Sequence, residues 1–100
     1  MAFALFYLDE VETDVEEAKI WYKAQKEGLE IEFAIAIEKA IERILDTPGA
    51  FAIRYKNVRI AHSKRFPYNI HFFIDQLKTT VTIIAIVHSK RDPKIAKKRI

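Results

Sequence analysis

The sequence predicts an α+β fold: a two-layer α/β sandwich, β-α-α-β-β-β(-β), with a helical hairpin packed on a mostly antiparallel sheet. Apolar residues recur at helical spacing in two segments of the first half, and the second half contains apolar runs at strand spacing. Each amphipathic helix leaves an apolar stripe that needs a partner layer, which the strands supply. With 100 residues and only 2 Gly and 3 Pro, the chain is expected to form one domain over residues 1–100.

The first strand and the first helix are predicted before residue 28. Phe3–Leu8 is apolar throughout but too short for a membrane span, so it predicts a buried strand. Thr13 and Glu16 have the spacing of a capping box, which starts or reinforces a helix running to about Lys26. Gly28 supplies a left-handed stop. The inward stripe of this helix is predicted to contain Val11, Val15, Ala18, Trp21, Tyr22 and Gln25.

A second helix is predicted over Glu30–Thr47, and Pro48 and Gly49 end it. Because only a few residues separate the two helices, they are expected to form an antiparallel hairpin. The inward stripe of the second helix is Phe33, Ala34, Ile37, Ala40, Ile41, Ile44 and Leu45.

Strands are predicted at Ile53–Lys56, Val58–Lys64, Tyr68–Asp75 and Thr79–His88. The third alternates between two faces, whereas the fourth is apolar at nearly every position, which favours a central place in the sheet. The short connection between them predicts an antiparallel hairpin. Asp92 and Pro93 end the last strand, and residues 94–100 form a basic tail that contains one or two helical turns at most.

Charge separates at the midpoint of the chain. Residues 1–50 carry 5 Lys and Arg against 12 Asp and Glu, a net charge of −7, whereas residues 51–100 carry 12 against 2, a net charge of +10. The whole chain has a net charge of +3, and all three histidines lie in the basic half. A local field of this size attracts an anionic polymer or an acidic protein segment.

Several kinds of chemistry are not supported by the sequence. There is no Cys, which excludes disulfides and thiolate metal sites and fits a reducing compartment such as the cytoplasm. No metal-binding motif, phosphate loop or cofactor motif occurs, so no metal and no cofactor are expected. Ser63 follows His62 and Ser89 follows His88, but adjacent side chains on a strand point apart, which disfavours a nucleophile and base pair.

Metal-free RNA cleavage needs only a base, cations around the phosphate and a donor to the leaving oxygen. Suitable residue types are Arg59, Lys64, Arg65, His88, Lys90 and Arg91, although the same residues also occur as solubilising side chains on strands. The most specific short string is Arg65-Phe66-Pro67-Tyr68. Pro67 favours a strand start there, and the planar guanidinium of Arg65 beside this turn suits a phosphate or a carboxylate.

Several short strings follow one another in order along the chain: Trp21-Tyr22, Gly28-Leu29, Phe33, Pro48, Val58-Arg59, Arg65-Phe66-Pro67-Tyr68 and His88-x-x-Arg91-Asp92-Pro93. Taken together, they resemble the ParE/RelE superfamily of bacterial toxins, and within it the ParE-like branch often named plasmid stabilisation proteins. The resemblance spans nearly the whole chain. It implies a RelE-like fold and a cytoplasmic toxin encoded beside an antitoxin, whose C-terminal segment wraps around the toxin and neutralises it.

The resemblance leaves the target open between DNA gyrase, which ParE-like toxins poison, and mRNA, which RelE-like toxins cut in the ribosome. Arg65 and Arg91 match the two arginine positions of the mRNA-cutting branch. The C-terminal Tyr or His of that branch is absent after Arg91, which favours the gyrase-binding branch and a protein that is not an enzyme. His88 is the substitute if the chain is a metal-free ribonuclease, with Arg65, Arg91 and His88 catalytic.

A third hypothesis for the function is that the chain has a toxin fold, has lost its toxicity and survives as a binding module. In all three readings an antitoxin is the expected partner, no membrane is involved, and a toxin dimer or a toxin–antitoxin hetero-oligomer is open. Trp21 and Tyr22 are expected to pack the helix onto the sheet, and His62 and His71 are expected to be strand residues of no special role. The tail cations are either solvated or close to the toxic surface. Target or antitoxin binding is expected at Arg59, Lys64, Arg65, Tyr68, Arg91 and Lys98.

Overall fold

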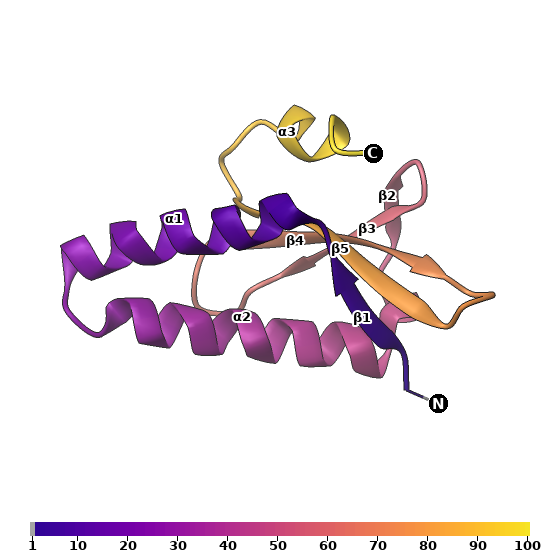
Figure 1. The fold of residues 1–100 in the computed structure, drawn as a ribbon, viewed down its shortest axis with the longest axis horizontal. Helices are drawn as coiled ribbons and strands as arrows, with labels where there is room; N and C mark the ends of the chain where they lie inside the picture. The colour runs from indigo at the N-terminus through magenta and orange to yellow at the C-terminus, as the bar shows by residue number, and fades with distance from the viewer. Residues whose placement is uncertain (1) are drawn as a thin grey trace.

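The computed structural model describes residues 2–100 as a five-stranded mixed sheet with a helical hairpin on one face and a short helix on the other (Figure 1). The strands lie in the order β1-β5-β4-β3-β2. This α+β arrangement confirms the predicted fold class. The elements are β1 (Ala4–Tyr7), α1 (Asp9–Gln25), α2 (Leu29–Asp46), the 3-10 helix η1 (Pro48–Ala50), β2 (Ile53–Tyr55), β3 (Val58–His62), β4 (Tyr68–Asp75), β5 (Thr80–His88) and α3 (Lys94–Lys97).

The helical hairpin turns at Gly28, whose φ of 93° is the left-handed conformation that the sequence predicts there. The Gly28 amide donates to the carboxylate of Glu30 at 2.8 Å, which starts α2. α1 begins at Asp9 with Leu8 as its N-cap residue, so the capping-box spacing at Thr13 lies inside the helix and does not start it. Three acidic side chains in the first turn of α1 instead interact favourably with the helix dipole.

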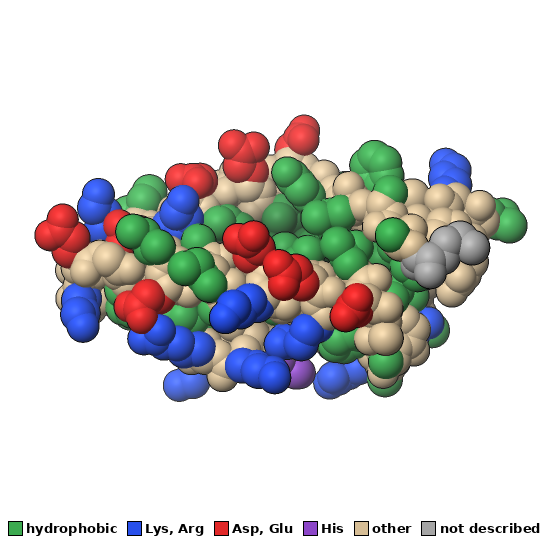
Figure 2. All heavy atoms as spheres, turned by 90° about the horizontal axis from the view of Figure 1, so that it is seen from below, with side chains coloured by type: hydrophobic (Ala, Val, Ile, Leu, Met, Phe, Trp, Pro, Cys, Tyr) green, Lys and Arg blue, Asp and Glu red, His purple; other side chains and the backbone are tan. Residues whose placement is uncertain are grey.

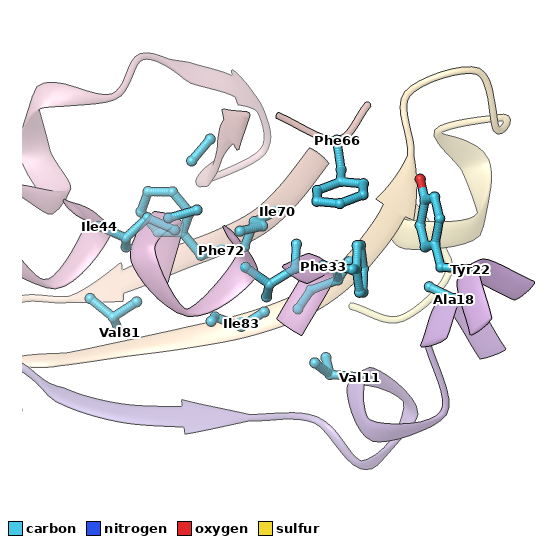
Figure 3. Close-up of a cluster of buried hydrophobic side chains, with 14 residues drawn as sticks. Val11, Ala18, Tyr22, Phe33, Ile44, Phe66, Ile70, Phe72, Val81 and Ile83 are labelled. Carbon is cyan, nitrogen blue, oxygen red and sulfur yellow. The ribbon is translucent and has the colours of Figure 1, made fainter. Parts of the chain in front are cut away.

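The main core lies between the hairpin and the sheet, where side chains from both helices point toward those of β4 and β5 (Figure 3). Tyr22 stacks on Phe33 with ring centroids 5.1 Å apart, and Phe66 meets Tyr22 edge to face at 4.9 Å. Trp21 was expected in this core, but its side chain is 57% exposed, so that prediction is wrong. Successive side chains of a helix point about 100° apart. Because Tyr22 points into the core, its neighbour Trp21 points away from it.

β1 is not the buried strand that its apolar run predicts. It pairs in parallel with β5 at the edge of the sheet, and Phe6 and Tyr7 are 57% and 59% exposed. Within β1, Leu5 packs against the main core, as do the flanking residues Phe3 and Leu8. A continuous apolar run is compatible with an edge strand as well as an interior one, because periodicity does not reveal the number of neighbouring strands.

β4 and β5 form the antiparallel hairpin expected from the short turn between them, and β5 lies between β1 and β4, as its apolar run predicts. The register shifts between His71 and Phe72. Both residues are almost fully buried, His71 at 2% exposure and Phe72 at 0%. The sheet is therefore covered on both faces over its centre, which a two-layer sandwich would not require.

The C-terminal segment covers the second face. Ala96 of α3 is fully buried against a cluster that includes Val58, Ile84 and Val87. Arg99 donates to both carboxylate oxygens of Asp14, at 2.7 and 2.9 Å, and to the carbonyl of Ile84 at 2.9 Å. One oxygen of Asp14 also accepts the amide of Ile86 at 3.0 Å. Arg99 is thus a structural anchor and not a solvated tail cation.

His71 lies beneath this segment and was expected to have no special role. The Tyr55 hydroxyl lies 2.9 Å from His71 Nδ1. Burial raises the pKa of Tyr55, so its hydroxyl remains protonated and donates this bond. Burial, together with the charges of Arg99 and Arg54, lowers the pKa of His71 to about 4, so the imidazole is neutral at physiological pH.

We predict that Asp14→Ala lowers the free energy of unfolding by about 3 kcal/mol, because it leaves the largely buried guanidinium of Arg99 without its partner and the Ile86 amide without an acceptor. Urea unfolding followed by circular dichroism measures the loss. The matched control is Glu16→Ala, which removes an exposed ion pair to Lys19 on the same helix and should change stability by less than about 1 kcal/mol. Equal effects would contradict the anchoring role of Asp14.

The His71 imidazole predicts a pH-dependent stability. Between pH 4 and 6.5 the unfolded chain binds a proton that the folded chain rejects, so stability is lost as the pH falls through this range. The loss should approach about 3 kcal/mol and level off below pH 4. Unfolding curves in urea at successive pH values measure it. His71→Gln should flatten this slope, and an unchanged slope would show that other groups produce it.

Candidate functional site

Most of the residues predicted to carry function line two grooves on either side of the loop between β3 and β4. The first, here called the α1 groove, has a volume of about 780 Å³ and lies between α1, the ends of β4 and β5, and the C-terminal segment. The second, the α2 groove, has a volume of about 770 Å³ and lies between α2 and the loop residues Lys64 and Arg65. Each groove contains cations and acids.

Tyr68, His88 and Arg91 come together in the α1 groove. Tyr68 begins β4 directly opposite His88 at the end of β5, and their ring centroids are 5.4 Å apart. Pro67 precedes this strand, as predicted, and its carbonyl accepts the Ser89 amide at 2.7 Å. The Arg91 amide donates to the His88 carbonyl at 2.9 Å. The backbone therefore fixes these three side chains relative to one another.

The opposite wall of the α1 groove is acidic and comes from α1. It contains Glu10, Asp14 and Glu17, followed by the exposed Trp21. Asp14 is neutralised by Arg99, whereas within residues 2–100 Glu10 and Glu17 form no ion pair. The Trp21 ring meets Tyr22 edge to face at 5.1 Å, so the indole has a fixed support. The α1 groove therefore has two walls of opposite charge, and the acidic wall also carries an exposed aromatic side chain.

Protonation decides what Tyr68 can do in this groove. Burial raises the pKa of Tyr68, the charge of Arg91 lowers it, and that of Asp14 raises it, with a net increase. The phenol is therefore protonated at neutral pH and acts as a hydrogen-bond donor. It is not a base under these conditions.

The α2 groove is organised around Arg65. Its guanidinium bonds to the carboxylate of Glu32 on α2 and lies over the ring of Phe66, 5.3 Å from the centroid. The Arg65 side chain is nevertheless 59% exposed. Arg43 donates to the carbonyl of His62 at 2.8 Å and so joins α2 to the end of β3. Ile35 and Ala36 supply the apolar part of the lining.

The structure does not bring Arg65 and Arg91 into one groove, although the two were expected to act together in the ribonuclease reading. Arg59 donates to the carbonyls of Gly49 and Phe51, where it holds η1 against β3. Lys98 is exposed on the C-terminal segment and lines neither groove. The predicted residues thus divide into a Tyr68, His88 and Arg91 cluster, an Arg65 and Lys64 pair, and Arg59 with a structural contact.

Sequence reasoning missed Trp21 and the Asp14–Arg99 pair as parts of the α1 groove. The helical stripe assigned Trp21 to the core, and no local pattern links residues that are 85 positions apart. A view of the molecule from the α2 side shows Lys and Arg side chains gathered along one edge, with acids and apolar side chains above them (Figure 2).

Residues 2–100 contain neither a cluster of metal ligands nor a membrane-spanning helix. No three His, Asp or Glu side chains in this range are grouped closely enough to hold a metal ion. No helix in this range is long and apolar enough to cross a membrane.

No protein-family model and no curated protein matches the sequence, but solved structures match the fold. A chain of the chromosomal ParDE toxin–antitoxin system from P. aeruginosa is 14% identical with a TM-score of 0.76, over 89% of this chain and 98% of that one. The toxin–antitoxin complex RelBE2 from Mycobacterium tuberculosis matches at 17% identity and a TM-score of 0.61, over 88% and 99%.

A mutant of the E. coli toxin RelE, solved with a peptide of its antitoxin RelB, matches at 14% identity and a TM-score of 0.59, over 100% of this chain and 96% of that one. At sequence identities this low, the similarity establishes the fold alone. The chain therefore has the fold of the ParE/RelE structures, which confirms the RelE-like fold that the sequence resemblance implies.

The contacts of Arg59 and Arg65 predict different effects on stability. Arg59→Ala removes donors to two backbone carbonyls and should lower the free energy of unfolding by about 1–2 kcal/mol. Arg65→Ala removes one exposed ion pair and an exposed contact with the Phe66 ring, and should change it by less than about 1 kcal/mol. Thermal denaturation of the two variants measures the difference. If Arg65→Ala is the more destabilising, Arg65 has a structural role that its exposure does not suggest.

Proposed function

We propose that this chain is the toxin of a type II toxin–antitoxin module, that an antitoxin neutralises it in the cytoplasm, and that it acts by binding DNA gyrase or a similar protein. The fold shared with the ParDE, RelBE2 and RelE structures supports the toxin assignment. One observation carries the choice of a protein target: the groove that holds Tyr68, His88 and Arg91 has an acidic wall.

An acidic wall disfavours RNA as the ligand. A phosphate backbone brought to Arg91 would also face Glu10 and Glu17, neither of which forms an ion pair within residues 2–100. A protein segment of mixed charge meets no such repulsion, because its own cations pair with these acids and its carboxylates with Arg91. Trp21 adds an exposed aromatic anchor of the type that dominates protein–protein interfaces.

The antitoxin is proposed to use the cations that the structure leaves accessible. Arg65 and Arg91 are exposed and lie in different grooves, so an extended or helical antitoxin segment that covers both must pass over the loop between β3 and β4. Its acids are expected at Arg65, Arg91 and Lys64. Two of the structural neighbours are toxins in complex with an antitoxin or a peptide of it, which supports a partner of this kind.

A metal-free ribonuclease is the second candidate function, because three suitable side chains do share the α1 groove. His88 would accept the proton of the attacking 2′-hydroxyl, and Arg91 would stabilise the phosphate. The protonated Tyr68 hydroxyl would donate its proton to the leaving oxygen. Arg65 would then bind RNA outside the reacting group and not in the catalytic cluster.

Expression of the full chain without an antitoxin tests these functions. If the proposal is correct, expression stalls replication and induces the DNA-damage response. Arg91→Ala or Trp21→Ala should reduce this toxicity, so that the number of surviving cells rises at least tenfold. Lys23→Ala, an exposed cation of α1 that lines neither groove, is the control and should leave toxicity unchanged. Translation arrest with cleaved transcripts would overturn the proposal in favour of the ribonuclease, and unimpaired growth would indicate a binding module without toxicity.

A further inference from the structure

The two edges of the sheet differ in how they are protected from pairing with another strand. β2 has three residues, with Arg54 at its centre and Lys56 directly after it, and charged residues on a short strand oppose edge-to-edge association. β1 lies at the opposite edge, and residues 2–8 contain no charged side chain. Phe6 and Tyr7 on this unprotected edge are more than half exposed.

The hydrogen bonds of β1 show which backbone groups remain available at this edge. Ala4 donates its amide to the carbonyl of Thr79, and Leu8 donates to that of Ile83, both at 3.0 Å. Successive residues of a strand point their amides and carbonyls in alternate directions. Phe6 therefore faces β5 together with Ala4 and Leu8, whereas the amides and carbonyls of Leu5 and Tyr7 point away from the sheet.

We propose that β1 is a self-association edge, at which a second copy of this chain adds its own β1 in antiparallel orientation about a two-fold axis. Leu5 of each copy then exchanges backbone hydrogen bonds with Tyr7 of the other. The centre of the pairing places Phe6 of one copy opposite Phe6 of the other, as a non-hydrogen-bonded pair in which side chains approach most closely. The five-stranded sheet of each copy becomes half of one continuous sheet.

Charge and layout favour a second copy as the occupant. The turn that carries Lys78 lies beside the start of β1, because Ala4 bonds to Thr79, and the acids Asp9 and Glu10 follow its end. Antiparallel pairing brings the Lys78 end of one copy toward the Asp9 and Glu10 end of the other, at both ends of the pair. α1 packs over β5 and α2, so it leaves the outer edge of β1 open.

A four-residue edge gives a small interface, so we expect a dimer whose population depends on concentration. Sedimentation equilibrium of the full chain over a wide concentration range measures its dissociation constant. Phe6→Lys should raise this constant at least tenfold, because it places two cations opposite each other at the two-fold axis. Ile20→Lys is the matched control: Ile20 is 69% exposed on α1, far from the edge, and the change should have no effect.

A charge exchange tests the orientation. Lys78→Glu and Glu10→Lys should each weaken the dimer, and the double variant should restore it. Circular dichroism and thermal denaturation establish that the variants remain folded.

Amide hydrogen exchange tests the register directly. The Leu5 and Tyr7 amides should exchange more slowly as the protein concentration rises, whereas the Ala4, Phe6 and Leu8 amides should be protected at every concentration. A single monomer mass throughout, loss of the dimer in Ile20→Lys but not in Phe6→Lys, or protection of β1 only by a segment of a different protein would overturn the proposal. These outcomes do not depend on the proposed toxin function.

Discussion

The remaining structure depends on the hydrogen bonds that the Asp14 carboxylate accepts. This carboxylate receives two donors from Arg99 and one from the Ile86 amide, so a single side chain of α1 joins the helical layer, β5 and the C-terminal segment. With Arg99 held there, α3 covers the second face of the sheet and buries Ala96. The same pair also lines the α1 groove, so the anchor that closes the fold shapes the site as well.

The loop between β3 and β4 divides the candidate site into two parts. Phe66 is buried under this loop against Tyr22 and Phe33, while its neighbour Arg65 remains exposed on the α2 side. Pro67 turns the chain so that Tyr68 enters the α1 groove. Four consecutive residues thus contribute to the core and to both grooves. A partner that binds both Arg65 and Arg91 must be long enough to cross the loop.

Short patterns in the sequence predicted the helices, strands and turns whose bounds depend on neighbouring residues. The alternation of β4 gave its bounds, Tyr68–Asp75, and Gly28 marked the turn of the hairpin. The place of β1 at the edge, the exposure of Trp21 and the role of Arg99 depend on contacts between distant segments, which no short window contains. The site was predicted by residue type, but its division into two grooves followed from the sheet order and the packing of α2.

Asp14 and Arg99 are 85 residues apart, and such a contact closes one of the largest loops available to a chain of this length. Long loops carry the greatest entropic cost of closure, so contacts of this kind form late in folding. The helical hairpin and the β4–β5 hairpin, in contrast, rest on neighbouring segments. We therefore expect the contact between Arg99 and Asp14, and with it this part of the α1 groove, to form after the two hairpins. A chain that has only partly folded would lack this part of the groove.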